Sequence, residues 1–236
     1  MPIQQKQSKM REGSKTTPQT KGNPDETTGS IVVAWIPKIT TTLNHVILAV
    51  AKHWLLIINV VIGLYAILPI LAPVLMVAGH ESVAWLIYAF YRPLCHQLPE
   101  RSFFLFGPQL TYTLDELRRL IGSDVPLRYI GNSTLGYKVA VCQRDIATYL
   151  AALLAGLAFA PLRHWLRPPS IRTFAVLCLP MAVDGLGQLL ALWDSTWWSR
   201  VSSGALFGLA CVWLAYPYIE DGMNDVLRVM HKELGK

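Results

Sequence analysis

Charged residues are scarce in this sequence. Lys, Arg, Asp and Glu make up 15% of its 236 residues, whereas a typical soluble domain has about 25%. Hydrophobic residues make up 53% and gather in long uncharged runs. Such a chain has too few polar groups for a water-facing surface, which excludes an ordinary soluble enzyme, and its apolar runs exclude a wholly disordered chain. The composition predicts a multi-span membrane protein.

Cysteines and known catalytic motifs are also few. Four cysteines are too few for a disulfide scaffold. The sequence has no Walker loop, dinucleotide fingerprint, nucleophile elbow, HExxH motif or haem attachment motif. The net charge of +6 comes from Lys and Arg beside apolar runs, which indicates cytoplasmic membrane flanks and argues against a nucleic-acid partner.

The chain is expected to begin with a polar tail and to continue as one helical membrane domain. Residues 1–30 are rich in Lys, Gln, Thr, Gly and Pro, and we expect them to be disordered. Residues 31–236 form the predicted domain, and their first part, 31–52, is expected to be an interfacial helix. Four apolar stretches are expected to cross the membrane as helices: 55–76, 146–161 extended back past residue 142, 172–193 and 200–219.

The stretch Ser82–Leu94 is apolar but too short for a span, so it is predicted to be a re-entrant or interfacial helix. The fold class is therefore all-α, a polytopic membrane helix bundle with about four transmembrane helices and this one short helix. Gly204 and Gly208 form a GxxxG spacing, which we expect to serve packing within the bundle.

Three groups of Lys and Arg lie before residue 53, in the short loop 163–172 and after the last span. Four spans, with both termini in the cytoplasm, place all three groups on the cytoplasmic side of a cell membrane. The segment 78–140 then lies outside and contains an extramembrane insertion near residues 107–138. Within it, Thr113 and Glu116 have the spacing of a capping box, which predicts a short helix ending at Gly122.

Two polar clusters hold candidate metal ligands. The segment 91–103 contains Cys95 and His96, and the segment 138–149 contains Cys142 and Asp145. Cys142 and Asp145 are three residues apart, so they share one helical face. Two thiols, an imidazole and a carboxylate could hold Zn2+ or Fe2+ tetrahedrally. Two other interpretations stay open: a disulfide between Cys95 and Cys142 on an oxidising face, or merely buried thiols.

A third polar group lies within the predicted spans. Asp184 and Gln188 are four residues apart on one helical face, and an unpaired carboxylate there would be costly. Arg200 and Arg144 are the candidate partners. Together with Arg101, these residues form a predicted intramembrane polar or substrate site; a structural clamp between helices is the alternative.

The order of these motifs resembles an uncharacterised family of small polytopic membrane proteins from bacteria and archaea. That family combines CHQ and RSF, a CxRC motif that begins a span, PxxxDGxxQ and SxxxRxxxG. The residues here that match are Cys95, His96, Gln97, Arg101, Ser102, Phe103, Cys142, Arg144, Pro180, Asp184, Gly185, Gln188, Arg200 and Gly204. Asp145 stands where the family has the second CxRC cysteine, and residues 110–137 look like an insertion. The resemblance implies a shared site but no known activity.

Three functions are compatible with these features. The first is a membrane protein with a metal- or thiol-based site at the outer face, beside an intramembrane Asp, Gln and Arg group. This hypothesis predicts that the polar residues converge in space. The second is a non-catalytic accessory subunit or assembly factor with scattered polar pairs, and the third is a small transporter. Contact with the lipid bilayer is expected in each case, with membrane protein partners or a homo-oligomer possible.

Overall fold

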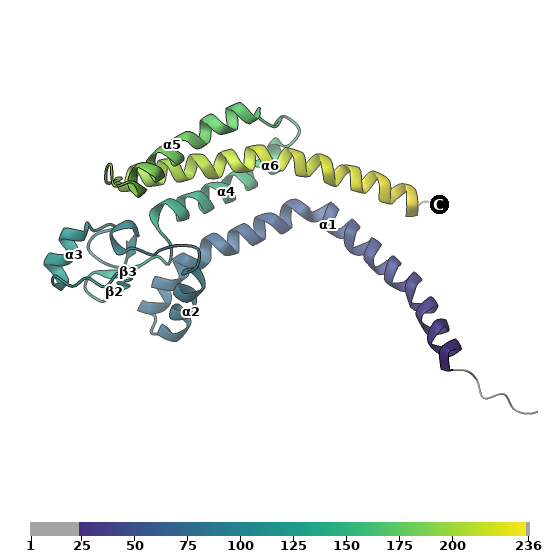
Figure 1. Cartoon of the computed structure of the whole chain (residues 1–236), viewed down its shortest axis with the longest axis horizontal. Helices are drawn as coiled ribbons and strands as arrows, with labels where there is room; N and C mark the ends of the chain where they lie inside the picture. Colours follow the sequence, from purple (N-terminus) through teal and green to yellow (C-terminus); the bar gives the residue numbers. More distant parts are fainter. Residues whose placement is uncertain (1–23, 235–236) are drawn as a thin grey trace, which may run out of the picture. The chain divides into compact units, whose positions relative to one another are not determined.

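The structure, a computed structural model of the chain, describes residues 24–234 (Figure 1). In this part the protein is all-α apart from three very short strands, as predicted. The helices are α1 (Pro24–Val77), α2 (Glu81–Tyr91), α3 (Leu114–Ile121), α4 (Gln143–Leu162), α5 (Ile171–Leu189) and α6 (Trp197–Leu234), with a 3-10 turn at Pro99–Arg101. The strands are β1 (Phe104–Leu105), β2 (Gly131–Asn132) and β3 (Gly136–Lys138).

The chain divides into two compact units, Met1–Val46 and Ile47–Lys236. In the first unit, residues 24–46 are the N-terminal part of α1, so the predicted end of the disordered tail at residue 30 is too late. The rest of that tail, residues 1–23, lies outside the described residues. The interfacial helix and the first span, predicted separately, are one continuous helix, because no glycine or proline separates them between residues 47 and 55.

Three helices in the described part of the chain are long and apolar enough to cross a membrane: Thr40–Val77, Gln143–Leu162 and Trp197–Lys232. They contain three of the four predicted spans. The fourth predicted span corresponds to α5. This helix is not apolar enough to be among the three, because Arg172, Asp184 and Gln188 interrupt its apolar sequence. Four crossings therefore stay a prediction. Exposed apolar side chains such as Leu64 and Leu154 provide surface for the bilayer.

Helices α4, α5 and α6 run alongside one another, with α6 packed against both α4 and α5 (Figure 1). A Cβ at Gly204 would lie 2.4 Å from the Arg144 carbonyl oxygen, and one at Gly208 would lie 2.3 Å from that of Thr148. The two glycines thus let the backbones of α4 and α6 approach closely. The predicted role of the GxxxG spacing in bundle packing is confirmed.

Helix α2 is the predicted short helix, and it ends at Tyr91, slightly earlier than expected. Its buried face holds Ala84, Ile87, Tyr88 and Tyr91. The Tyr88 hydroxyl donates to the Lys138 carbonyl oxygen at 2.5 Å, and the Tyr91 hydroxyl donates to that of Tyr65 at 2.7 Å. These bonds attach α2 to β3 and to α1.

The segment between α2 and α4 contains a small antiparallel sheet with strand order β1-β3-β2. Its strands are too short to show the alternation by which sequence patterns reveal strands, so the sheet was not predicted. The predicted capping box is confirmed: the Thr113 amide donates to Glu116 Oε2 at 2.7 Å, and the Glu116 amide donates to Thr113 Oγ1 at 3.2 Å. This capped helix is α3, which ends before Gly122 as expected.

Candidate functional site

The predicted site residues converge at one end of the bundle. A cavity of about 420 Å³ lies where the segment 94–101 meets the start of α4, the end of α5 and the start of α6. Its lining includes all four candidate metal ligands, Cys95, His96, Cys142 and Asp145. Its other polar residues are Gln97, Arg101, Arg144, Gln188 and Arg200. Of the predicted set, Asp184 alone does not line the cavity, but it is bonded to Arg144.

Three of the four candidate ligands form a compact group. The ligand atoms of Cys95, Cys142 and Asp145 all lie within 4.8 Å of one another. Cys142 is the N-cap of α4 and Asp145 lies in its first turn, so the predicted shared face is confirmed. The Cys142 amide donates to Cys95 Sγ at 3.3 Å, which joins the loop after α2 to the start of α4.

Cys95 and Cys142 are free thiols in the structure, and their pKa values differ. A hydrogen bond with the Cys142 thiol lowers the pKa of Cys95, because it stabilises the Cys95 thiolate. The same bond, together with burial, raises the pKa of Cys142. Cys95 is therefore the thiol that ionises first, and it is the better initial ligand.

His96 does not join the compact group. Its side chain is exposed at the edge of the cavity, whereas both neighbours in the chain, Cys95 and Gln97, are buried.

Gln97 holds the Cys95 loop in place. Its backbone has φ of 56°, which is uncommon for a residue with a side chain. Gln97 Nε2 donates to the carbonyl oxygens of Tyr88 at 2.8 Å and Ala140 at 2.9 Å. Its own carbonyl oxygen accepts from Lys138 Nζ. The loop is thereby attached to α2 and to the strand that leads into Cys142.

Lys138 is a fully buried cation in this attachment. Burial disfavours its charged form and lowers the pKa of Lys138 to about 8. In the sequence Lys138 is a single charge followed by Val139, Ala140 and Val141. An isolated charge beside an apolar run was the signal that could have identified it.

Asp184 organises the polar group that was predicted to lie within the membrane. Arg144 Nη2 forms an ion pair with Asp184 Oδ2, so Arg144, rather than Arg200, is its partner. The hydroxyls of Ser195 and Ser199 both donate to Asp184 Oδ1 at 2.7 Å. This network joins α4, α5 and α6, and the two serines were not predicted as site residues.

Among the residues that the structure describes, Arg200 has neutral acceptors only. Its Nη1 donates to Gln143 Oε1 at 3.0 Å and to the Glu100 carbonyl oxygen at 3.4 Å. Gln143 in turn donates to the Ser102 carbonyl oxygen at 3.2 Å. Gln143 therefore links α6 to the segment before β1, a role that its position beside Cys142 did not reveal.

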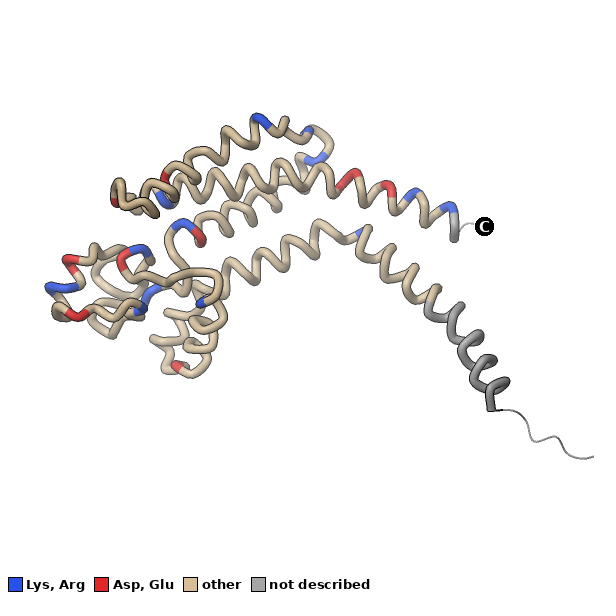
Figure 2. Tube along the Cα trace, viewed as in Figure 1, with Lys and Arg blue, Asp and Glu red and all other residues tan. Residues whose placement is uncertain are grey.

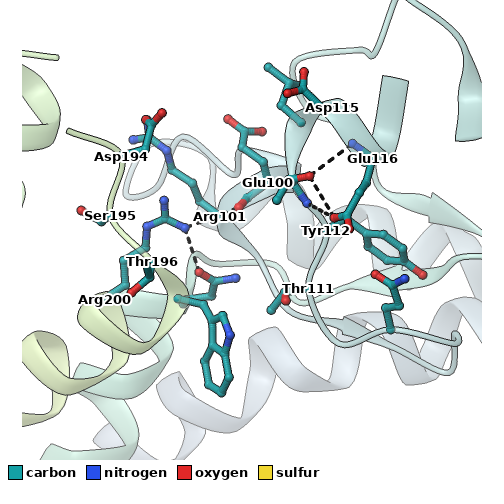
Figure 3. A pocket seen from close by; sticks show the side chains of 15 residues that line it. Glu100, Arg101, Thr111, Tyr112, Asp115, Glu116, Asp194, Ser195, Thr196 and Arg200 are labelled. Carbon is teal, nitrogen blue, oxygen red and sulfur yellow. Dashed lines mark hydrogen bonds between the residues drawn. The ribbon is translucent and has the colours of Figure 1, made fainter. Parts of the chain in front are cut away.

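A second cavity, of about 770 Å³, lies on the other side of Arg101 and Arg200, which line both cavities. Figure 3 shows the side chains of these two arginines extending into the same region from the 3-10 turn and from α6. Carboxylates of Glu100, Glu116 and Asp194 line this second cavity. Yet within residues 24–234 neither arginine forms an ion pair.

These features define an α-helical membrane protein with a polar site, containing two thiols, carboxylates and arginines, at one end of its bundle. Residues 133–214 match the family described as "Predicted membrane protein (DUF2085)". The chain is also 28% identical over 174 residues to the uncharacterised protein MJ1492 of Methanocaldococcus jannaschii, covering 70% of this chain and 92% of that protein. The predicted resemblance to an uncharacterised membrane protein family with archaeal members is thus confirmed. No solved structure is significantly similar to the chain.

Proposed function

We propose that the protein is a membrane protein whose thiol and carboxylate cluster holds Zn2+ or Fe2+. One observation carries this proposal: the ligand atoms of Cys95, Cys142 and Asp145 lie within 4.8 Å of one another. Ligands around a tetrahedral zinc ion are about 3.5–4 Å apart, given bonds of roughly 2.0–2.3 Å. Small side-chain rotations would therefore close the cluster around an ion.

The donor types fit these metals. Thiolate sulfur favours Zn2+ and iron over Mg2+ or Ca2+, which prefer all-oxygen ligands. Three protein ligands leave the fourth position of a tetrahedral ion open, an arrangement typical of catalytic rather than structural zinc. His96 lies at the edge of the same cavity, and this fourth position is the one it was predicted to fill.

Convergence of the polar residues favours this function over an accessory subunit. An accessory subunit predicts scattered polar pairs, whereas eight of the nine predicted site residues line one cavity and the ninth, Asp184, is bonded to one of them. A clamp between helices explains the Arg144–Asp184 pair but does not require two thiols and a carboxylate beside it.

Element analysis of the detergent-purified protein, with a count of free thiols, tests the metal proposal. We expect near-stoichiometric Zn or Fe, lost in Cys95→Ser and Cys142→Ser and retained in the matched control Cys211→Ser. His96→Ala distinguishes two forms of the site. Loss of metal in this variant would identify His96 as the fourth ligand, and retention of metal would indicate that the fourth coordination position is open. Unchanged metal in a folded Cys142→Ser would remove Cys142 from the ligand set, and two missing thiols without metal would indicate a disulfide.

We further propose that the site faces outward from a cell membrane and that both termini are cytoplasmic. Arg163 and Arg167 lie in the loop after the far end of α4, away from Cys142 at its start, and Arg172 lies in the first turn of α5. Figure 2 shows blue residues gathered there. Such basic loops favour the cytoplasmic side. Fluorescence of a C-terminal green fluorescent protein fusion in a bacterial host is the expected result, and an inactive, exported fusion would contradict this orientation.

A further inference from the structure

We propose that the arginine-lined side of the site binds a phosphate group. This inference rests on the proposed function, because the phosphate would bind in the same cavity as the proposed metal ligands. The guanidinium groups of Arg101, Arg144 and Arg200 line this cavity. Guanidinium is the side chain best suited to bind phosphate oxygens in pairs.

The cavity has more positive charge than its own carboxylates balance. Asp184 forms an ion pair with Arg144, but no Asp or Glu in the described part of the chain pairs with Arg101 or Arg200. Arg101 and Arg144 repel Arg200 electrostatically, and the attraction of Asp184 for Arg200 is smaller. Arg200 is only 7% exposed, and a buried charge with neutral partners is expensive unless an anion compensates it.

Several donors in the walls of the cavity have no acceptor. Arg144 Nε, Gln188 Nε2 and Arg200 Nε are buried and make no hydrogen bond with any residue that the structure describes. They come from α4, α5 and α6, and all three residues line the same cavity. A buried donor without an acceptor costs about 1–3 kcal/mol. Three such donors on residues that line one cavity, beside Arg101 and Arg200 without an ion pair in the described part of the chain, fit an anion with several oxygens.

The apolar residues of the cavity indicate what carries the phosphate. Leu94, Leu98 and Leu189 complete its lining, and Leu94 is 57% and Leu189 78% exposed. Polar donors inside and exposed leucines at the edge suit the headgroup and the first chain atoms of a phospholipid. The volume of about 420 Å³ is within the range of small-molecule sites.

Binding is best measured by calorimetry on the purified full-length protein in phosphate-free detergent. The probes are inorganic phosphate, dihexanoyl phosphatidic acid and, as the uncharged control, dihexanoylglycerol. We expect the phosphatidate to bind and dihexanoylglycerol not to bind. If inorganic phosphate binds as tightly as the phosphatidate, the ligand is free phosphate. If inorganic phosphate binds more weakly than the phosphatidate, the ligand is a lipid headgroup. Equal binding of phosphatidate and dihexanoylglycerol would overturn the proposal.

Substitutions test the arginines. Arg101→Gln should weaken phosphate binding about 10- to 100-fold, and the matched control Arg172→Gln, at the far end of α5, should leave it unchanged. Gln188→Met is a second variant that should fold well, because it removes a donor without an acceptor. We expect it to raise the melting temperature of the ligand-free protein and to weaken phosphate binding. A lower melting temperature with unchanged phosphate binding would mean that Gln188 is purely structural.

Metal analysis of the same samples keeps this proposal separate from the metal site. Arg101→Gln should retain metal and lose phosphate affinity. Cys142→Ser should lose metal and still bind phosphate within a few-fold of the parent protein. If Cys142→Ser instead lost phosphate binding and Arg101→Gln kept it, the metal and not the arginines would hold the phosphate, and the inference would be wrong.

Discussion

Arg144, at the start of α4, and Asp184, near the end of α5, form a buried ion pair between residues 40 positions apart. Their side chains are 17% and 9% exposed. Ser195 and Ser199 bond the other carboxylate oxygen, so both oxygens of Asp184 have partners. A carboxylate with partners for both oxygens avoids the cost of an isolated buried charge, and this network brings three helices together beside the thiol cluster.

Removing one partner of this pair should destabilise the protein strongly. Arg144→Gln leaves Asp184 as a buried charge without its cation, for which we expect a loss of about 3–5 kcal/mol in unfolding free energy. Denaturant unfolding in detergent measures it, and the double variant with Asp184→Asn should recover part of the loss. The control is Arg118→Gln, which breaks an exposed pair with Asp115 and should cost less than about 1 kcal/mol. Equal losses in both variants would show that burial does not determine the strength of the Arg144–Asp184 pair.

The close approach of α4 and α6 gives a second prediction. Gly208→Ala puts a Cβ 2.3 Å from the Thr148 carbonyl oxygen, so the helices must separate, at a cost of about 1–3 kcal/mol. Gly222→Ala on the same helix is the control, because nothing lies within 4 Å of its Cβ. There the higher helix propensity of alanine should stabilise the protein by up to about 1 kcal/mol. Melting temperatures shifted in the same direction for both variants would contradict this account of the packing.

Lys138 predicts a specific pH dependence. Its pKa is about 8 in the folded protein and 10.5 ordinarily, so between these values the unfolded chain binds more protons. Stability then rises with pH, because the cost of the buried ammonium is present below pH 8 and is relieved as pH approaches 10.5. Relative to Lys138→Met, the parent protein should gain up to about 3 kcal/mol across this window.

Unfolding free energies of the two proteins at several pH values between 7 and about 10.5 test this gain. Taking their difference cancels the groups that both share. Lys232→Met, which alters an exposed lysine, should show no such slope against the parent protein. A flat difference for Lys138→Met as well would mean that Lys138 is neutral, or well solvated, throughout the range.

Local sequence patterns were sufficient for the membrane class, the main helices and the capped helix α3. Long uncharged runs require a lipid environment whatever their partners, and the Thr113–Glu116 capping box involves residues three apart. The residue types of the site could also be read from the chain, since Cys, His, Asp and Arg are costly near a membrane unless they have a role. The boundary of the N-terminal tail and the continuity of α1 were not predicted correctly, because helix ends depend on weak local preferences.

The tertiary structure alone decided how those residues are paired. Arg144 and Arg200 were equal candidates for Asp184 in the sequence, and helix packing assigned Arg144 to it and left Arg200 to Gln143. Likewise His96 diverges from Cys95 although they are neighbours in the chain. These outcomes depend on distances between residues that are far apart in the sequence and on the direction of individual side chains. Composition and periodicity contain neither quantity, and the packed backbone determines both.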